Sequence, residues 1–391
     1  MGELSAKKFL ILSPGVKMNL TVDGLIYQRQ VKGGVSRIFN EILPLMCSKC
    51  RALSVRLVAL GKLAQDFPRH EQIRPIKKFS LDGILWPQRV WWPVDGYLRE
   101  LALLQLSGQA QNAIWHSTYY TIPPGWKGPK IVSVYDLIHE KFSHLFLGPR
   151  WDQVRREMAR AIHRADILLC ISESTAVDLI EVHGVSPEKV RVAPLAHSSV
   201  FEEGTAGFSG KPDKPYLLTV SSRFGHPTFA YKNVKTFLDA YAGWEFRKDF
   251  EIICVADRWS DLERHVLSDM GLSDDVKLRA NPSDQELAGL YHFASASVYP
   301  SKYEGFGIPV LESLAAQCPV VTTRVPSMLE VGLNAPFYFD PTDVEELRQS
   351  LTRAVLDGRD PDRIALGREV SRRFSWDRTA RATLEAYESV L

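Results

Sequence analysis

The most restrictive feature of this 391-residue sequence is the alternation of short β-branched or aliphatic runs with longer helical patterns. That alternation is typical of a parallel sheet covered by helices, because parallel strands need a long crossover and a helix usually supplies it. The first half of the chain contains candidate strands at Lys8–Leu12, Val55–Leu60, Ala113–Trp115, Lys130–Val134, Ile167–Ile171 and Val190–Val192. The second half contains them at Tyr216–Val220, Glu251–Val255, Val276–Leu278, Ala296–Tyr299 and Val320–Thr323. We therefore expect an α/β protein with two doubly wound parallel sheets.

A stretch rich in glycine, proline and charge separates the two series, over residues 201–215. Such composition is typical of a linker. We therefore expect a first domain over residues 1–205 and a second over 206–375, with a final amphipathic helix at Trp376–Leu391. In the first domain we expect a loop at Met18–Lys32 and helices at Val35–Met46, Arg150–Ala165 and Ser174–His183. Two such domains enclose a cleft at the carboxyl ends of their strands, where open α/β sheets bind ligands.

The charge of the chain is unevenly distributed. The formal net charge is only +2, but residues 1–205 hold 26 Lys and Arg against 19 Asp and Glu, while residues 206–391 hold 22 against 27. A basic first half indicates an anionic partner. We discount nucleic acid, since no binding module of that kind is recognisable. The composition, 45% hydrophobic and 24% charged, excludes intrinsic disorder and indicates a globular protein.

The cysteines indicate a reducing compartment, which we expect to be the cytoplasm. There are five of them, an odd and scattered number that does not form a disulfide framework. Cys47 and Cys50 have the spacing of half a zinc site, but no second pair follows, so we favour two small apolar residues near a helix end. The apolar run Phe9–Leu12 is too short for a signal peptide. No apolar stretch reaches the roughly 20 residues that span a bilayer, so any membrane contact is from one side.

The most informative segment is residues 298–322, which has the order strand, loop, helix, strand. Gly305 and Gly307 allow the loop backbone to approach a ligand closely, and Pro309 suits the first turn of a helix. The backbone N–H groups of that turn suit a phosphate. Glu304 then lies at the reacting end of the ligand, and Glu312 is placed to accept hydrogen bonds from a vicinal diol such as ribose. From the residues alone, a capped helix with solvated acids is the competing interpretation.

The run Tyr303-Glu-Gly-Phe-Gly-Ile-Pro-Val-Leu-Glu312 resembles the Glu-x7-Glu signature of the retaining glycosyltransferases of family 4, which have the GT-B fold of two Rossmann-like domains. The likeness extends over nearly the whole chain and includes bacterial mannosyltransferase-like enzymes of surface polysaccharide assembly. It implies that Glu304 lies by the donor sugar, that Glu312 binds the nucleotide ribose, and that the backbone between them meets the sugar and the diphosphate. It also implies that the last helix crosses back to the first domain.

Further donor-binding residues follow from the same resemblance. Lys232, in Tyr231-Lys-Asn233, is similar to the family's cation at a helix start, and Arg223 to its partner cation, although Phe224–Ala230 is longer than the usual connection. Gly33-Gly34 resembles the Gly-Gly loop of the family's first domain, and the segment at Asn281 its base-side segment. The expected donor-binding set is Gly33, Gly34, Arg223, Lys232, Asn281, Gly305, Phe306, Gly307, Leu311 and Glu312.

Two residues of the first domain join Glu304 as catalytic candidates. His116 and Asp136 each follow a predicted strand, so we expect both to face the cleft. His116 matches a histidine that the family often has beside the donor sugar, and we expect it to orient sugar and acceptor. The family's histidine before the aspartate is Tyr135 here, so no acid-base role carries over to that position. The resemblance implies that a donor phosphate oxygen accepts the proton of the acceptor hydroxyl.

The expected function is transfer of a hexose, mannose or a related sugar, from a nucleotide-diphosphate donor to a hydroxyl of a glycan or lipid-linked glycan, with retention and without a metal or other cofactor. Asp360 and Asp362 lie in a late polar turn and are not expected to bind a metal. Residues Trp86–Tyr97 and the arginines of the helix at 150–165 suit either contact with the inner membrane face or core anchors beside a solvated helix face. A nucleotide-sugar epimerase and a catalytically silent nucleotide-sugar-binding protein are the alternatives.

Overall fold

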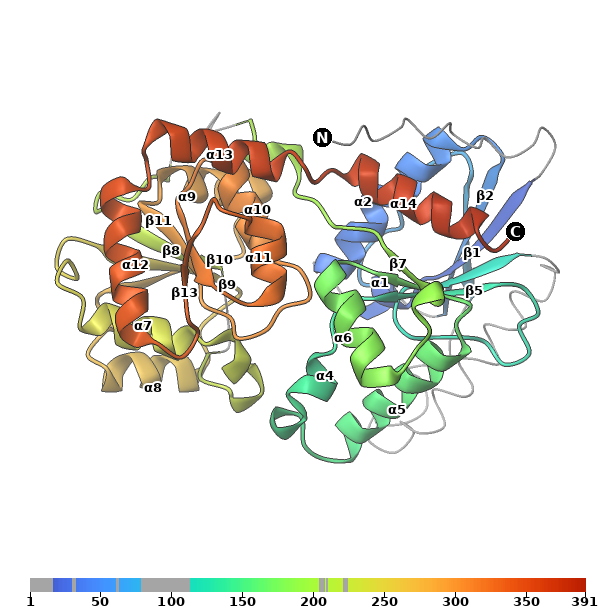
Figure 1. The fold of residues 1–391 in the computed structure, drawn as a ribbon, viewed down its shortest axis with the longest axis horizontal. Coiled ribbons are helices and arrows are strands. Elements are labelled where there is room, and N and C mark those ends of the chain that lie inside the picture. The colour runs from blue at the N-terminus through green and yellow to red at the C-terminus, as the bar shows by residue number, and fades with distance from the viewer. Residues whose placement is uncertain are drawn as a thin grey trace.

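The computed structural model of the chain describes residues 17–29, 33–60, 63–78, 113–203, 208, 210–220 and 224–391. Its strands form two separate parallel sheets, each covered by helices, and the two α/β bodies lie side by side (Figure 1). The expected α/β class with two parallel sheets is confirmed. The predicted strand at Lys8–Leu12 lies outside the described residues.

The first sheet has seven strands in the order β3-β2-β1-β4-β5-β6-β7, and all neighbours are parallel. Its strands are β1 Met18–Asp23, β2 Leu53–Leu60, β3 Ile73–Lys78, β4 Ile114–Ser117, β5 Lys130–Val134, β6 Ile167–Cys170 and β7 Val190–Val192. Every residue of the short strands β4 and β6 is buried, as expected for strands covered on both faces.

The loop expected over Met18–Lys32 is wrong in its described part, because β1 and the helix α1 (Leu25–Arg29) occupy it. The strand escaped detection because polar residues alternate with its apolar ones. Thr21 and Asp23 are nevertheless fully buried, since β1 lies in the middle of the sheet. The Asp23 carboxylate accepts hydrogen bonds from Leu25 N–H, Thr118 N–H and the Thr118 hydroxyl. These bonds replace the water that the carboxylate loses on burial.

The three helices expected in the first domain are confirmed to within a few residues. With the remaining helical segments they are α2 Gly34–Lys49, α4 Ile138–Lys141, η1 Ser143–Leu145, α5 Pro149–Arg164, α6 Glu173–His183, η2 Pro187–Lys189 and η3 Ser199–Phe201. Helix α6 begins at the Ser172 cap, whose hydroxyl accepts from Thr175 N–H, and ends at Gly184 in the left-handed conformation, φ 61°.

The second sheet has six parallel strands in the order β10-β9-β8-β11-β12-β13. Its strands are β8 Tyr216–Val220, β9 Glu251–Ala256, β10 Val276–Ala280, β11 Ala296–Tyr299, β12 Val320–Thr323 and β13 Phe337–Phe339. Its helical segments are η4 Pro227–Lys232, α7 Val234–Ala242, α8 Asp261–Asp269, α9 Asp284–Phe293, α10 Ile308–Ala315, α11 Pro326–Gly332, α12 Val344–Asp357 and α13 Pro361–Ser371. The five strands predicted here are confirmed, and β13 was not predicted.

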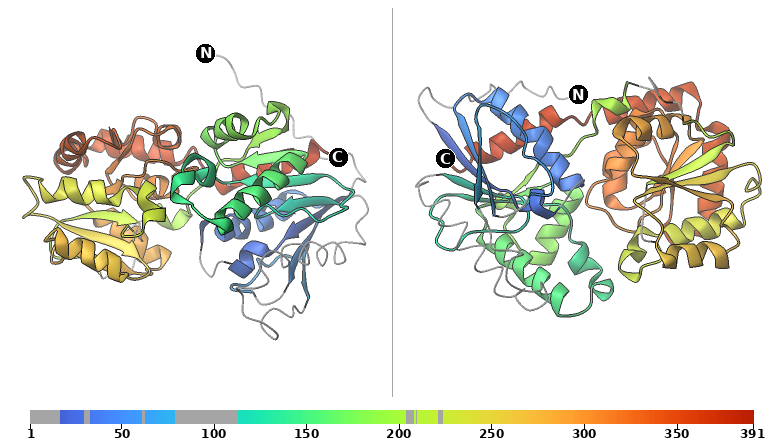
Figure 2. Two further views of the ribbon diagram at one scale, coloured as in Figure 1. Left: turned by 90° about the horizontal axis from the view of Figure 1, so that it is seen from below. Right: turned by 180° about the vertical axis from the view of Figure 1, so that it is seen from behind.

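The last helix, α14 (Trp376–Glu388), crosses from the second domain back to the first and packs against α2 (Figures 1 and 2). Its buried face includes Ala380, Leu384 and Tyr387, three of the residues whose spacing predicted an amphipathic helix. Lys49 at the end of α2 forms an ion pair with Asp377, which adds a polar contact at the edge of this face. The crossing helix therefore completes the core of the first domain.

Candidate active site

A partly buried ion pair lies at the carboxyl edge of the second sheet. Glu304 is in the loop that follows β11, and its Oε1 accepts a hydrogen bond from Lys232 Nζ at 2.7 Å. Lys232 ends the short helix η4, and its ammonium also lies 5.2 Å and 5.8 Å from the ring centres of Tyr231 and Tyr299. Burial alone would lower the pKa of Lys232, but the Glu304 carboxylate raises it well above its usual value. The lysine is thus a fixed cation.

The turn into α10 brings backbone very close to the other domain. Gly307 caps the helix with φ 127°, a conformation that favours glycine. A Cβ on Gly305 would lie 1.7 Å from the Tyr135 carbonyl oxygen and 3.1 Å from the Asp136 Cβ. Phe306 is buried and packs edge-on against Phe374, with ring centres 5.7 Å apart. The loop therefore needs glycine at 305 because the first domain touches it there.

The second carboxylate of the motif, Glu312, lies inside α10 and is only 6% exposed. Its nearest polar neighbours are the Tyr291 hydroxyl, which donates to Glu312 Oε2 at 3.4 Å, and Arg37 Nη1, 3.9 Å from Oε1. Arg37 comes from α2 of the first domain and also binds Asp284 at 2.6 Å. Burial raises the pKa of Glu312 to about 7, with Arg37 acting in the opposite direction.

Asp136 faces this group from the first domain. It follows β5, and its carboxylate accepts a hydrogen bond from Ile138 N–H at 3.0 Å. Burial raises its pKa, with Glu304 adding to the rise, while Ile138 N–H, His139 and Lys232 oppose it. The structure thus brings together three expected site residues, Glu304, Lys232 and Asp136, from the facing edges of two sheets.

His116 does not line the cleft, and this expectation is wrong. Its side chain on β4 is fully buried, with Nδ1 2.6 Å from the Tyr387 hydroxyl and Nε2 2.8 Å from the Ser133 hydroxyl. Burial lowers its pKa to about 3, so the ring is neutral. It followed a strand end in the sequence, but β4 continues through it to Ser117, and α2 and α14 cover it there. It is a core histidine.

The remaining predicted donor residues are placed as follows. Gly33 caps α2 and Gly34 is its first residue, with open space where a Cβ would be on Gly34. Asn281 is exposed just beyond β10, with a left-handed φ of 46°, and Leu311 is fully buried inside α10. Arg223 lies outside the described residues. The structure does not bring Asn281 into contact with the Glu304 group, and its base-side role stays a prediction.

A set of contacts that the sequence patterns did not predict joins the two domains beside Glu304. Tyr303, directly before it, donates from its hydroxyl to Asp178 Oδ2 at 2.8 Å and accepts from Leu137 N–H at 3.0 Å. The Gly305 carbonyl accepts from the Ser172 hydroxyl at 2.6 Å and from Thr175 Oγ1 at 3.0 Å. Nothing in the local pattern marks Asp178 or Tyr303, because their partners lie on the other domain.

Among the described residues, no group of three or more His, Cys, Asp or Glu side chains is arranged to hold a metal ion. Cys47 and Cys50 are free thiols at the end of α2. Asp360 caps α13, where its carboxylate accepts from the N–H groups of Asp362 and Arg363. None of the helices in the described ranges has the length and apolar character to cross a bilayer.

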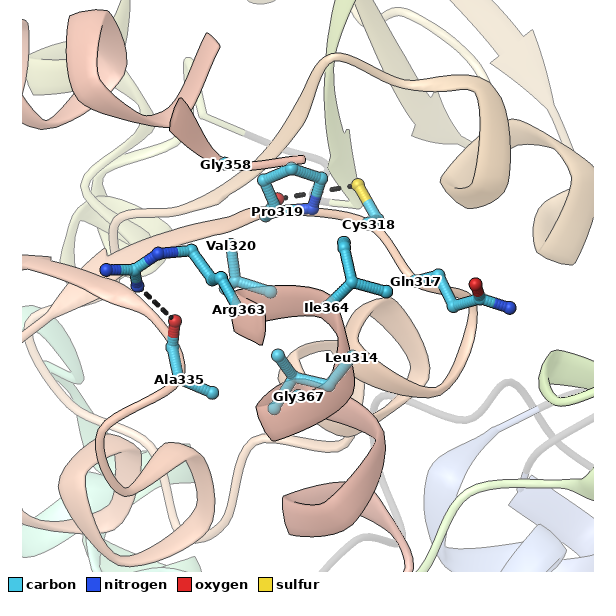
Figure 3. Close-up of a pocket in the computed structure, with 10 residues that line it drawn as sticks. All are labelled: Leu314, Gln317, Cys318, Pro319, Val320, Ala335, Gly358, Arg363, Ile364 and Gly367. Carbon is cyan, nitrogen blue, oxygen red and sulfur yellow. Dashed lines mark hydrogen bonds between the residues drawn. The ribbon is translucent and has the colours of Figure 1, made fainter. Parts of the chain in front are cut away.

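A small cavity between α10 and α13 is not part of this site (Figure 3). Its volume is about 10 Å³, room for about one water. Leu314, Ile364 and Val320 line it, and Arg363 turns to the Ala335 carbonyl, 2.9 Å away. It is a packing void beneath the helix that carries Glu312.

Two protein-family models match the chain, and each covers most of one domain. Residues 51–196 match the model of Glycosyltransferase Family 4, and residues 205–368 match that of Glycosyl transferases group 1. The chain is 25% identical over 321 residues to the O-antigen chain mannosyltransferase RfbU of Salmonella typhimurium, covering 81% of this chain and 82% of that protein. It is 28% identical over 251 residues to the MMP alpha-(1->4)-mannosyltransferase of Mycolicibacterium hassiacum, covering 62% of this chain and 58% of that protein.

Among solved structures, the sucrose-phosphate synthase of Thermosynechococcus elongatus superposes with a TM-score of 0.77 at 16% identity, covering 95% of this chain and 99% of that one. This likeness supports the two-domain fold. Together the two family models cover most of the chain, including the loop that carries Glu304 and the helix that carries Glu312. The protein is thus a glycosyltransferase of the GT-B fold, and it belongs to family 4.

Proposed function

We propose that the enzyme transfers a hexose, mannose or a close relative, from a nucleotide-diphosphate sugar to a hydroxyl of a glycan or lipid-linked glycan, with retention of the anomeric configuration. The observation that carries the proposal is the partly buried Lys232–Glu304 pair, 2.7 Å long, placed beside the glycine-rich start of α10 and opposite Asp136. The two named relatives are mannosyltransferases, which supports the choice of sugar.

The donor fits the second domain by charge and hydrogen bonding. The diphosphate sits against the N–H groups at the start of α10, with Lys232 as its cation. Glu312 accepts the ribose hydroxyls from its place further along the same helix. Glu304 holds Lys232 in position before the donor arrives and lies beside the sugar when it is bound.

The reaction then replaces one bond at the sugar C1 with another. The bond from C1 to the β-phosphate oxygen breaks, and the acceptor oxygen bonds to C1 on the same face. The acceptor proton passes to the departing phosphate oxygen. Negative charge grows on the diphosphate as it leaves, so the fixed Lys232 ammonium stabilises the transition state more than the ground state. Asp136 lies on the acceptor side and orients the incoming hydroxyl.

A nucleotide screen tests the donor assignment. UDP, GDP, ADP and dTDP are each added to the protein and the melting temperature is measured; a ligand at 100 times its Kd stabilises by about 2.7 kcal/mol. We expect one base to stand out, and Lys232→Met to abolish the shift. Lys235→Met is the matched control, because Lys235 is 67% exposed on α7 and pairs with Asp239 of the same helix. No shift with any nucleotide contradicts the proposal.

Retention and metal independence are tested with the complete transfer reaction. With an α-linked donor such as GDP-mannose, we expect NMR to show an α-glycoside. We expect EDTA to leave the rate unchanged, since Lys232 and the helix start supply the positive charge. An inverted product, or activity that returns only with added Mg²⁺, contradicts this part of the proposal.

A lipid-linked acceptor would place the enzyme on the cytoplasmic face of a membrane. Arg150 and Arg156 on α5 are exposed, and Leu147 just before the helix is 75% exposed. Basic residues beside an apolar one suit an anionic lipid surface. We expect binding to phosphatidylglycerol vesicles but not to phosphatidylcholine, and loss of binding on changing both arginines to glutamate. The same change at exposed Arg258 and Arg264 is the control.

A further inference from the structure

Several of the contacts that join the two domains around Glu304 come from helix α6 and its Ser172 cap. Ser172 and Thr175 bind the Gly305 carbonyl, and Asp178 accepts the Tyr303 hydroxyl. We call these five residues the α6 clamp. Glu330 of α11 adds a further contact, because its carboxylate accepts from the first two N–H groups of α6, each at 2.9 Å.

The clamp holds Glu304 from both sides along the chain. Tyr303 precedes it and Gly305 follows it, and each is fixed to the first domain by hydrogen bonds of 2.6 to 3.0 Å. The side chain of Glu304 is left to face Lys232 in its own domain. A displacement of α6 would therefore move the backbone on both sides of this carboxylate.

The Tyr303 hydroxyl also reaches the loop that carries Asp136, the other carboxylate of the site. It accepts from the N–H of Leu137, the residue after Asp136, while it donates to Asp178. Asp178 is 8% exposed and is paired with Lys141, so the oxygen that accepts from Tyr303 belongs to a carboxylate held in place by an ion pair. One hydroxyl group thus links the loop of Glu304 to the loop of Asp136.

The surroundings restrict the Tyr303 ring to this position. It is 9% exposed and packs with Ile138 and Phe146, and the Phe142 ring centre lies 5.8 Å away. Phe142 in turn lies 6.3 Å from the ring of Tyr231, the neighbour of Lys232. The aromatic cluster joins the first domain to η4 and keeps water from the hydroxyl.

We propose that Asp178 and Tyr303 are positioning residues that set the separation of Glu304 and Asp136 when the domains are in contact. In this role they act through the two carboxylates and not by contact with donor or acceptor. This inference rests on the proposed role of Glu304. Misplacement of a reacting group by about 1 Å costs on the order of 100-fold in rate. Loss of either positioning residue should therefore lower kcat and leave the affinity for the donor nearly unchanged.

The first test removes one oxygen atom. Tyr303→Phe keeps the ring and loses both hydrogen bonds, and we expect kcat for GDP release from GDP-mannose, without acceptor, to fall at least 10-fold while the Kd for GDP changes less than threefold. Tyr241→Phe is the matched control, because Tyr241 is fully buried in the second domain and its hydroxyl donates to Phe250 O at 2.9 Å. Equal kcat values for the two variants overturn the proposal, as does a fall in kcat that only follows a fall in melting temperature.

A double-mutant cycle separates this inference from the proposed role of Glu304. Glu304→Gln at the wild-type rate defeats both. If Glu304→Gln is slow, adding Tyr303→Phe should cost less than threefold more, because the hydroxyl acts through that carboxylate. Full additivity of the two losses overturns the positioning role alone. Asp178→Asn, which keeps an oxygen for the Tyr303 hydroxyl, should retain more turnover than Asp178→Ala; the reverse order also counts against it.

Discussion

A neutral imidazole between two hydroxyl groups, as at His116, keeps its place only while it stays uncharged. Its folded pKa of about 3 lies below the ordinary value near 6.5, so the stability it contributes is present above pH 6.5 and is lost as the pH falls toward 3. Between pH 7 and pH 5 this loss amounts to about 2 kcal/mol. We expect His116→Asn to remove that part of the pH dependence and to retain turnover where the protein is folded.

Urea unfolding at pH 7 and pH 5 measures this effect directly. His265→Asn is the control, because the His265 side chain is 76% exposed on α8. Wild-type and His116→Asn proteins that lose the same free energy of unfolding between the two pH values would show that His116 is protonated in the folded state. Loss of turnover in a folded His116→Asn protein would restore the residue to the reaction.

The pH dependence of stability expected from Glu312 has the opposite sign to that expected from His116. Its folded pKa of about 7 lies above the unfolded value near 4.5, so its favourable contribution is present below pH 4.5 and lost as the pH rises through 7. A charged Glu312 at pH 8 then costs on the order of 3 kcal/mol. We expect Glu312→Gln to raise the melting temperature at pH 8, to change it little at pH 4.5, and to weaken nucleotide binding.

Glu345→Gln is the control for the effects of Glu312→Gln on stability and on nucleotide binding, since the Glu345 side chain is 64% exposed on α12. In the wild type, nucleotide affinity should also fall below pH 7, because the diol needs the carboxylate form of Glu312 as its acceptor. An unchanged melting temperature for Glu312→Gln at pH 8 would mean that the carboxylate carries no burial cost.

Between elements, the contact of the α10 loop with the β5 loop limits how the domains meet. The Cβ of Gly305→Ala would lie 1.7 Å from the Tyr135 carbonyl oxygen, so the domains must separate to admit it. We expect a 100-fold or greater loss of turnover, nucleotide binding within threefold of wild type, and a larger radius of gyration in X-ray scattering. Gly210→Ala is the control, because its Cβ meets the Phe208 ring only at 3.5 Å. Wild-type turnover in Gly305→Ala would show that this contact is dispensable.

Elements with a local signal were predictable, and those fixed by distant contacts were not. Gly305, Gly307 and Pro309 mark the start of α10 in the sequence, and the helix begins there. The strand β1 was missed because polar residues alternate with its apolar ones, and the buried Asp23 finds partners far along the chain, as when Thr118 N–H donates to it. Strand position alone suggested that His116 and Asp136 both face the cleft. Only coordinates show that the helices α2 and α14 close over the first of them.

The same distinction applies to the candidate site. The family signature placed Glu304 and Glu312 on one loop and helix, and Lys232 at a helix start, because those spacings are local. The partners from the first domain have no such signature. Arg37 beside Glu312 and Asp178 behind Tyr303 are brought in by the packing of two domains. Sequence patterns therefore describe the donor half of the site better than the interface that arranges it.

At the scale of the whole molecule, the unequal charge of the two halves is the property that most affects association. Residues 1–205 carry seven more basic than acidic side chains, and residues 206–391 five more acidic than basic. An acidic domain still binds an anionic donor if partly buried local groups such as Lys232 supply the positive charge, and salt screens partly buried pairs only weakly. Salt strongly screens the exposed excess of basic charge on the first domain. Salt should therefore affect the two substrates differently.

We expect transfer to an anionic acceptor, such as a lipid-diphosphate-linked glycan, to lose several-fold in kcat/KM for that acceptor between about 0.1 and 1 M KCl, where the Debye length falls from about 10 to 3 Å. Hydrolysis of saturating donor without acceptor should change less than twofold over the same range. Arg150→Glu with Arg156→Glu should flatten the salt dependence of transfer, because these exposed α5 side chains are part of the excess. If transfer and hydrolysis respond equally to salt, the basic half attracts no acceptor, and its charge serves only the solvated surface.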